Sequence, residues 1–360
     1  MVKKLLYHMC KWTGGFYLAR RFTRRGLRIL AYHGFALGDE IDFQPPLFID
    51  TSVFRERMKY LVRKGYPVLS LDDAVERLQA GTLPECATTL TFDDGFHSIW
   101  KKAVPVLNEL KLPGTIYVTT YYCLKGNPIF RLVIQYMFWK TTTTELDLNG
   151  LGLHETGKVH FPDTRSADEI VWRIIRYAET QMKEDQRVHL CEEVGKRLGV
   201  DYSDIVKKRY FTLMTKDEIR EAGRVGVDIQ LHTHRHVLPI EAELVAREIE
   251  NNRELLEPLV GRRLHHFCYP SGIYHKDHLE PLSAAEVKSG TTCNAGLNYT
   301  DTPPLTLNRF LDGSNVSWIE FEAEMSGFTD LLRKARYRLK QFTYQGGDGL
   351  AAWGMVACIM

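Results

Sequence analysis

The chain has 360 residues, 44% of them apolar and 26% charged, so it is long enough for one large α/β domain or two smaller ones with a real core. With 47 Lys and Arg against 45 Asp and Glu, the net charge of +2 favours no class of partner. The seven cysteines are scattered, odd in number and without Cys-x-x-Cys spacing. This pattern argues against a disulfide framework or a zinc knuckle and favours a reducing compartment.

Residues 1–28 form a basic segment with interleaved apolar side chains. The segment holds eight Lys or Arg and no acidic residue. Its uncharged stretches are too short to span a bilayer or to form a signal-peptide core, so we expect neither a transmembrane helix nor a cleavable signal peptide. Such a segment can lie on an anionic membrane surface, or it can form a helix packed on the protein with a solvated basic face. A nucleic-acid partner is not expected, because nothing else in the chain extends a basic surface.

The first expected strand, within residues 27–34, is apolar and ends at His33 before Gly34. Taken alone, a histidine at the end of a strand is usually structural. Helices are expected over residues 50–65 and about 70–81, and each of them ends at a glycine.

Residues 87–92 alternate as strand residues do, and Asp93, Asp94 and Gly95 end the run. Neighbouring strand side chains point to opposite faces, so two carboxylates converge only where the strand bends into a loop, for which glycine supplies the freedom. Their repulsion must be offset by a cation or by protonation of one of them. A metal ion would let one Asp be a ligand while the other stays free as a base. The alternative is a solvated Asp-Asp-Gly turn.

The next expected strand covers residues 114–120, and the alternation of strands and helices favours a parallel sheet or barrel. Residues from about 125 to 210 break this rhythm with turn sequences and a charged helical pattern over about 167–198. We interpret this stretch as an insertion that either caps the site or recognises substrate.

A second polar cluster follows the strand pattern of residues 227–231 and contains His232, His234 and His236. Imidazole is the commonest metal-binding side chain, and two histidines with one carboxylate leave open positions on zinc or a related divalent ion. We predict His232 and His236 as the ligand pair, with Asp94 as the third ligand. The alternative is a polar loop with incidental histidines.

Four further patterns complete the chain. A long amphipathic helix is expected over about 240–259, a polar loop over 264–272 and a strand over 305–310. The stretch from about 318 to 344 has the pattern of a single basic amphipathic helix. This helix could pack against the barrel or join residues 1–28 at a membrane surface.

The two polar clusters resemble the motifs of the polysaccharide deacetylases, carbohydrate esterase family four with the NodB homology domain. Thr-Phe-Asp-Asp-Gly stands unaltered at 91–95, and His232 to His236 matches the family's His-Ser/Thr-x-x-His motif. The resemblance implies that Asp93 is the catalytic base and that Asp94, His232 and His236 hold the metal. It extends over the chain to about residue 310 but does not cover the insertion.

The loop at 264–272 resembles the third family motif in its Phe-x-Tyr-Pro-x-Gly variant. The resemblance implies that the backbone N–H of Ser271 binds the developing oxyanion. The motif's usual arginine, which orients the base, is replaced here by Cys268. Because the strand that carries Arg309 resembles one found in variant members, we predict that Arg309 replaces that arginine as the partner of Asp93.

The family also needs a histidine acid in a Leu-x-x-His motif, usually near the C-terminal end of the domain. No histidine follows His278 in this chain, but residues 30–33 fit the motif. Some family members are circularly permuted, so that this strand comes first. The resemblance therefore assigns His33 as the general acid.

The expected fold is α/β, a distorted (β/α) barrel of the polysaccharide deacetylase type with an inserted α/β lobe. Residues 29–311 would form the barrel, with the insertion at about 125–210. The basic segment at 1–28 would precede the barrel, and a helical tail at 312–360 would follow it.

The function implied by the resemblance is a metal-dependent hydrolase, with Zn²⁺ or another first-row metal as cofactor, that removes N-acetyl groups from amino sugars of a polysaccharide or glycan. Its expected location is the cytoplasm or the cytoplasmic face of a membrane. Two alternatives remain: an amidohydrolase of the same fold acting on a small non-sugar amide, and a non-catalytic glycan-binding module.

Overall fold

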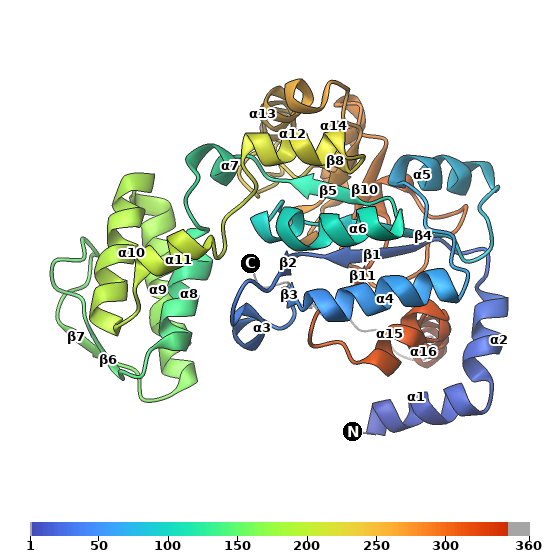
Figure 1. Cartoon of the computed structure of the whole chain (residues 1–360), viewed down its shortest axis with the longest axis horizontal. Helices are drawn as coiled ribbons and strands as arrows, with labels where there is room; N and C mark the ends of the chain where they lie inside the picture. Colours follow the sequence, from blue (N-terminus) through green and yellow to red (C-terminus); the bar gives the residue numbers. More distant parts are fainter. Residues whose placement is uncertain (1, 345–360) are drawn as a thin grey trace.

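A computed structural model describes residues 2–344 of the chain, and its centre is one parallel sheet (Figure 1). The seven strands of this sheet lie in the order β10-β9-β8-β5-β4-β1-β11. Their bounds are β1 (Arg28–Tyr32), β4 (Thr88–Phe92), β5 (Thr115–Val118), β8 (Asp228–Leu231), β9 (His266–Cys268), β10 (Ser289–Thr291) and β11 (Phe310–Leu311). All six neighbouring pairs are parallel, as the alternation of strands and helices predicted.

The sheet curls so that one stretch of chain, residues 307–311, contacts both of its edges. Leu307 forms a parallel bridge with Thr291 at the end of β10. Three residues later, Phe310 pairs with Leu30 of β1 at the other edge. The expected distorted (β/α) barrel is therefore confirmed.

Helices between the strands cover the outside of the barrel (Figure 1). They are α4 (Thr51–Arg63), α5 (Leu71–Ala80), α6 (Val104–Leu110), α12 (Lys216–Arg224), α13 (Ala242–Val260) and α14 (Leu279–Ala284). Shorter elements join them: β2 (Gly34–Phe35), α3 (Glu40–Phe43), β3 (Phe48–Ile49), the π-helical turn η1 (Ile99–Ala103), α7 (Tyr121–Lys125) and the 3-10 turns η2 (Pro270–Gly272), η3 (Lys276–His278) and η4 (Pro304–Thr306). Helix α5 begins at a side-chain cap, since Ser70 accepts the N–H of Asp73.

The insertion folds as a mainly helical lobe beside the barrel (Figure 1). It contains α8 (Phe130–Lys140), the antiparallel strands β6 (Glu145–Asp147) and β7 (Lys158–His160), α9 (Thr164–Gln181), α10 (Glu184–Leu198) and α11 (Tyr202–Lys208). The helical pattern over 167–198 is thus two helices, because Met182 takes an extended backbone conformation between them. No glycine or proline marks this break in the sequence.

The two ends of the described chain pack against each other. Helices α1 (Val2–Trp12) and α2 (Gly15–Phe22) contact α15 (Trp318–Met325) and α16 (Phe328–Tyr344), and the rings of Tyr7 and Phe16 both lie against Phe328. The prediction of a single helix over 318–344 is wrong, because Gly327, with φ +76°, separates α15 from α16. The tail beyond residue 344 lies outside the described residues.

Within residues 2–344, no helix combines the length and the apolarity needed to cross a membrane.

One partly buried carboxylate joins the end of the lobe to the barrel. Glu218 in the first turn of α12 accepts the N–H of Thr215, as the capping box requires, at 2.9 Å. Its carboxylate also pairs with Arg209, which follows the lobe, at 2.6 Å and with His97, which precedes η1, at 2.9 Å. Burial alone would raise the pKa of Glu218, but the bonds from His97 and Arg209 outweigh it and lower the pKa to about 2.

We expect Glu218→Gln to lower the free energy of unfolding by about 1–3 kcal/mol near neutral pH, the usual range for losing hydrogen bonds to a charged group. The pKa of Glu218 is lower in the folded than in the unfolded protein, so its stabilisation is complete above the ordinary pKa of a glutamate and is lost as the pH falls toward about 2. Urea unfolding at neutral and acidic pH measures the difference between the two proteins. Glu221→Gln on the exposed side of α12 is the matched control. A difference that stays constant with pH would contradict this role of Glu218.

Candidate active site

Strand register places a histidine beside the first aspartate of the acidic pair. In the parallel pair β1–β4, Tyr32 lies opposite Phe92, so the next residues, His33 and Asp93, emerge together at the carboxyl end of the sheet. The Nε2 atom of His33 lies 3.7 Å from Oδ2 of Asp93. Both side chains are almost fully buried.

The backbone turns sharply at the second aspartate, which separates the two carboxylates. Asp94 has φ +66° and Gly95 has φ +80°, a left-handed conformation that Asp tolerates and Gly adopts freely. A Cβ on Gly95 would come within 3.0 Å of the Val118 side chain, so this position also lacks room for a larger residue. The expected bend at the end of the strand is present.

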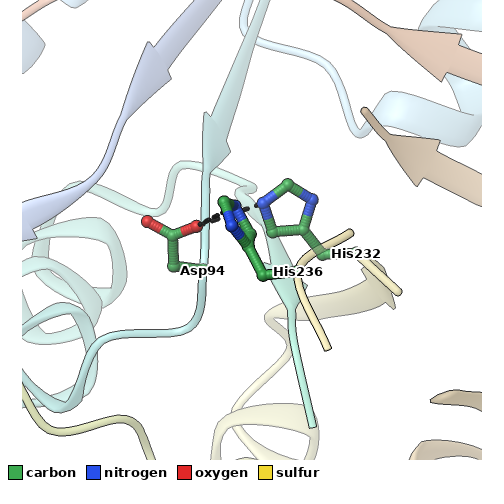
Figure 2. Close-up of side chains that lie close together, drawn as sticks. All are labelled: Asp94, His232 and His236. Carbon is green, nitrogen blue, oxygen red and sulfur yellow. Dashed lines mark hydrogen bonds and ion pairs between the residues drawn. The ribbon is translucent and has the colours of Figure 1, made fainter. Parts of the chain in front are cut away.

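Asp94, His232 and His236 point toward one another (Figure 2). Nε2 of His232 lies 3.1 Å from Oδ1 of Asp94, and Nε2 of His236 lies 3.2 Å from the same oxygen. One ligand atom from each residue lies within 4.8 Å of the others. His234, between the two histidines, points elsewhere, because its Nδ1 is 2.9 Å from the hydroxyl of Thr120.

The chemistry of these three residues fits a divalent metal ion. Cys268 O lies 2.8 Å from Nδ1 of His232, and since a carbonyl only accepts, the ring carries a proton there and Nε2 is the atom left to bind a metal. Oδ2 of Asp94 and Nε2 of His236 are buried without a hydrogen-bond partner among the described residues. Burial would raise the pKa of Asp94, but the imidazole rings of His232 and His236 beside Oδ1 outweigh it and hold the pKa well below its ordinary value. An ionised carboxylate and two imidazole rings therefore converge, with electron pairs still available to bind a metal ion.

Arg309 forms a buried, two-point ion pair with Asp93. Its Nη1 and Nη2 atoms donate to the two carboxylate oxygens at 2.6 and 2.7 Å. Arg309 Nε also donates to the Thr292 carbonyl at 2.9 Å, which fixes the plane of the guanidinium. Burial alone would raise the pKa of Asp93, but the charge of Arg309 outweighs it and lowers the pKa below its ordinary value. The contact predicted from sequence is present.

Cys268 occupies the position of the missing motif arginine as a small buried residue. Its Sγ lies 3.2 Å from Nη2 of Arg309, so the guanidinium of a distant strand fills the space beside it. Burial raises the pKa of the Cys268 thiol, which is thus neutral and unsuited to be a nucleophile.

Ser271 lies near two of the three predicted metal ligands. It is in the η2 turn with φ +55°, and it lines a cavity of about 470 Å³ together with Asp94 and His236. The structure therefore brings all seven predicted site residues together, six from the carboxyl ends of strands or the loops beside them and Arg309 from the position before β11. They are Asp93, His33, Ser271, Arg309, Asp94, His232 and His236.

Two residues of α13 that sequence analysis did not single out support the histidine loop. Asn252 is fully buried, accepts the backbone N–H of His232 at 2.9 Å and donates to the Val118 carbonyl at 2.9 Å. Glu248, one turn earlier, accepts the N–H groups of His234 and Arg235 at 3.0 and 2.9 Å. Polar residues spaced by four on the buried side of an amphipathic helix were the signal that could have identified them.

The lobe contributes the opposite wall of the cavity. Arg131 of α8 and Glu179 of α9 line it and form a two-point ion pair at 2.9 and 2.6 Å. Arg187 of α10 also lines it and donates to the Tyr121 hydroxyl of α7 at 3.2 Å. The insertion is therefore part of the site's surroundings.

Comparison with known proteins agrees with the motifs. A family model described as polysaccharide deacetylase matches residues 80–143 and 192–290. The poly-beta-1,6-N-acetyl-D-glucosamine N-deacetylase of Escherichia coli strain K12 is 33% identical over 94 residues, which are 26% of this chain and 14% of that relative. The chain thus spans only a small part of the length of the curated relative. The resemblance to the polysaccharide deacetylases predicted from the sequence is confirmed.

Solved structures share the fold. The Streptococcus pyogenes deacetylase PplD in complex with acetate aligns with a TM-score of 0.56 and 18% identity, covering 84% of this chain and 99% of that one. IcaB from Ammonifex degensii aligns with a TM-score of 0.52 and 18% identity, covering 84% and 97%. At these identities the likeness shows the barrel-type architecture.

We expect Arg309→Met to lower the free energy of unfolding by about 3–5 kcal/mol, because Asp93 would keep a buried charge without a partner. Arg309→Lys, which keeps the charge but loses the two-point fork, should lose less. The double variant Asp93→Asn with Arg309→Met should recover part of the loss, since no unpaired charge remains. Urea unfolding of the four proteins near neutral pH measures this coupling. Equal stability of the Arg309→Met and double variants would contradict it.

Proposed function

We propose that this chain is a metal-dependent deacetylase that removes N-acetyl groups from the amino sugars of a glycan. The observation that carries the proposal is that two sets of functional groups lie side by side at the end of the sheet. Asp94, His232 and His236 form a ligand set, and directly beside it lies an ionised, buried Asp93 with His33 3.7 Å away. A ligand set, a base and an acid at one place are what metal-assisted amide hydrolysis requires.

Asp94, His232 and His236 would hold the metal, and we propose Zn²⁺ as the ion, because two imidazoles and one carboxylate are a common zinc set with open positions. A metal in this position supplies Lewis-acid chemistry, polarising the amide carbonyl and making water more acidic. The histidine ring orientation is fixed by this chain itself, through the bond from His232 Nδ1 to the Cys268 carbonyl.

Asp93 would take the proton of the attacking water. Arg309 lowers the pKa of Asp93 and so keeps it ionised at neutral pH. Each carboxylate oxygen has two lone pairs, so the bond that each accepts from Arg309 leaves a second acceptor position for a water proton. Arg309 thereby fixes the direction of the base without occupying all of its lone pairs.

His33 and Ser271 would act on the other atoms of the amide. His33 lies beside Asp93 and would donate a proton to the sugar nitrogen as the C–N bond breaks, giving acetate and a free amine. The backbone N–H of Ser271, at the edge of the cavity, would donate to the oxygen on which negative charge develops.

A glycan is the substrate that we favour over a small amide. In support, the curated relative is named for a poly-N-acetylglucosamine, and the cavity of about 470 Å³ continues beyond the ligand set to Tyr121, Arg131 and Arg187. Hydroxyl, guanidinium and aromatic groups suit a polar, ring-shaped ligand. The intact base and ligand set argue against a non-catalytic glycan-binding module.

We also propose that the protein works in the cytoplasm or at the cytoplasmic face of a membrane, with residues 1–28 as its point of membrane contact and no nucleic-acid partner. Five cysteines within residues 2–344 form no disulfide, which supports a reducing compartment; they are Cys10, Cys86, Cys123, Cys191 and Cys268.

Purified wild type is expected to contain stoichiometric metal and to release acetate from an N-acetylglucosamine oligomer. Asp93→Asn should keep the metal and lose activity by about 100–10,000-fold, the usual share of a general base. His236→Ala should lose the metal, and a chelator should abolish wild-type activity until Zn²⁺ is returned. Elemental analysis and acetate assays measure both quantities.

Three results would be decisive. Metal in wild type and Asp93→Asn with acetate from wild type alone would support the proposal. Metal in both without acetate from the oligomer, but with hydrolysis of small amides, would favour the non-sugar amidohydrolase. Absence of metal from both would contradict the proposed ligand set.

His33→Gln is expected to retain metal and to lose about 100–10,000-fold in acetate release from the oligomer. The loss should largely disappear with 4-nitrophenyl acetate, because its leaving group departs without protonation. Steady-state kinetics with both substrates test this, and His265→Gln, a partly exposed histidine away from the ligand set, is the control. Equal losses with both substrates would contradict the role of His33 as acid.

A further inference from the structure

Helix α1 is attached to the protein by its basic side. Lys3 and Lys11 extend toward α15 and pair with Glu320 at 3.2 Å and Glu322 at 2.5 Å. Tyr7, on the same side of the helix, is the one buried residue of α1. The arrangement is the opposite of an ordinary surface helix, which packs its apolar face on the protein. Helix α1 is therefore packed on the protein, with lysines that pair with α15 at the flank of the contact and stay partly exposed.

The apolar sides of α1 and α2 consequently face solvent. Trp12 is 91% exposed, Val2 83% and Phe22 77%. The other large exposed apolar side chains of these two helices are Leu5, Leu6, Met9, Tyr17 and Leu18. We call this set of eight side chains the terminal apolar face. Exposed apolar side chains gathered in this number on two neighbouring helices point to an interaction surface.

Packing on the inner side fixes this orientation. Phe328 of α16 lies against the rings of Tyr7, at 5.9 Å, and Phe16, at 5.4 Å. Thr23, just after α2, is buried and its hydroxyl is within 3.2 Å of the Ser326 carbonyl. The positions facing α15 and α16 are thus filled, so the terminal apolar face cannot simply turn inward.

The basic residues around the terminal apolar face indicate what kind of partner covers it. Residues 1–28 contain no acidic side chain. Arg21 and Arg25 are exposed on or just after α2, and Lys3, Lys4 and Lys11 remain about half exposed at the flank of α1. A second copy of this chain in a two-fold interface would bring the same basic residues together, which is unfavourable. An anionic lipid surface offers both the apolar interior and the negative charge.

We propose that helices α1 and α2 form a membrane-binding hairpin for an anionic phospholipid bilayer. The terminal apolar face enters the boundary between headgroups and acyl chains, with the exposed aromatic side chains of Trp12 and Tyr17 in the interfacial layer that such rings favour. The lysines and arginines at its flanks meet the lipid phosphates. Because the hairpin lies at the end of the molecule away from the lobe (Figure 1), membrane binding leaves the lobe side of the barrel uncovered.

The test is co-sedimentation of the full chain with vesicles, a measurement that is independent of the proposed reaction. One set of vesicles is phosphatidylcholine alone, and the other is an equimolar mixture with phosphatidylglycerol. Wild type is expected to bind the mixed vesicles and to bind the neutral ones more weakly. The variant with Leu5→Ser, Trp12→Ser and Phe22→Ser should lose about 100-fold or more in partition coefficient.

Two matched variants complete the design. The variant with Val62→Ser, Val206→Ser and Leu244→Ser removes three exposed apolar side chains from other helices and should bind like wild type. The variant with Arg21→Gln and Arg25→Gln should lose on the order of tenfold toward mixed vesicles only. Thermal unfolding checks that all variants fold as wild type does.

Failure of wild type to bind either vesicle would overturn the proposal, as would equal binding by the two serine variants. A wild-type dimer that the Leu5, Trp12 and Phe22 substitutions dissociate, without vesicle binding, would identify a second copy as the occupant and would also overturn it. None of these results depends on whether the chain releases acetate.

Discussion

The buried ion pair between Asp93 and Arg309 is the constraint on which the rest of the site depends. Two charges in the interior are tolerated only when the geometry is good and the remaining donors are satisfied, and the guanidinium meets both conditions through its two-point contact and its bond to the Thr292 carbonyl. The pair joins the end of β4 to the residue before β11, which are not neighbours in the sheet, since β1 lies between them. The same interaction therefore keeps Asp93 ionised and connects the end of β4 to the start of β11 across β1.

Much of the site could be predicted from sequence because parallel strands end at one edge. Asp93, Asp94 and His232 each come directly after a strand pattern, and His33 does so as well, so their proximity follows once the strands are parallel and in register. Arg309 could be anticipated only through the resemblance to variant deacetylases. Nothing in its own spacing points to Asp93, from which it is separated by more than half of the chain.

The parts that sequence did not predict are those determined by contacts between distant elements. Asn252 and Glu248 look like ordinary polar residues of an amphipathic helix until the strand that they support is placed against them. The break at Met182 carries no glycine or proline, and it is visible only in the extended backbone of Met182 and in the new N-cap at Lys183. The orientation of α1 was not predicted for the same reason. The side of this amphipathic helix that faces the protein is set by Glu320 and Glu322, which belong to a helix at the other end of the chain. Periodicity identifies the apolar and polar faces of a helix, but it does not show which face contacts the rest of the protein.

The stretch at 307–311, which contacts both edges of the sheet, is synthesised late, so the barrel is completed late in translation. Synthesis runs from the N-terminus, so β1, the acidic pair and the histidine loop all emerge before Arg309 does. A nascent or stalled chain that ends earlier would carry Asp94, His232 and His236 next to an Asp93 carboxylate without its guanidinium partner. Its first strand would also lack the neighbour that covers one of its edges. The ion pair between Asp93 and Arg309 can therefore form only after nearly the whole barrel has been translated.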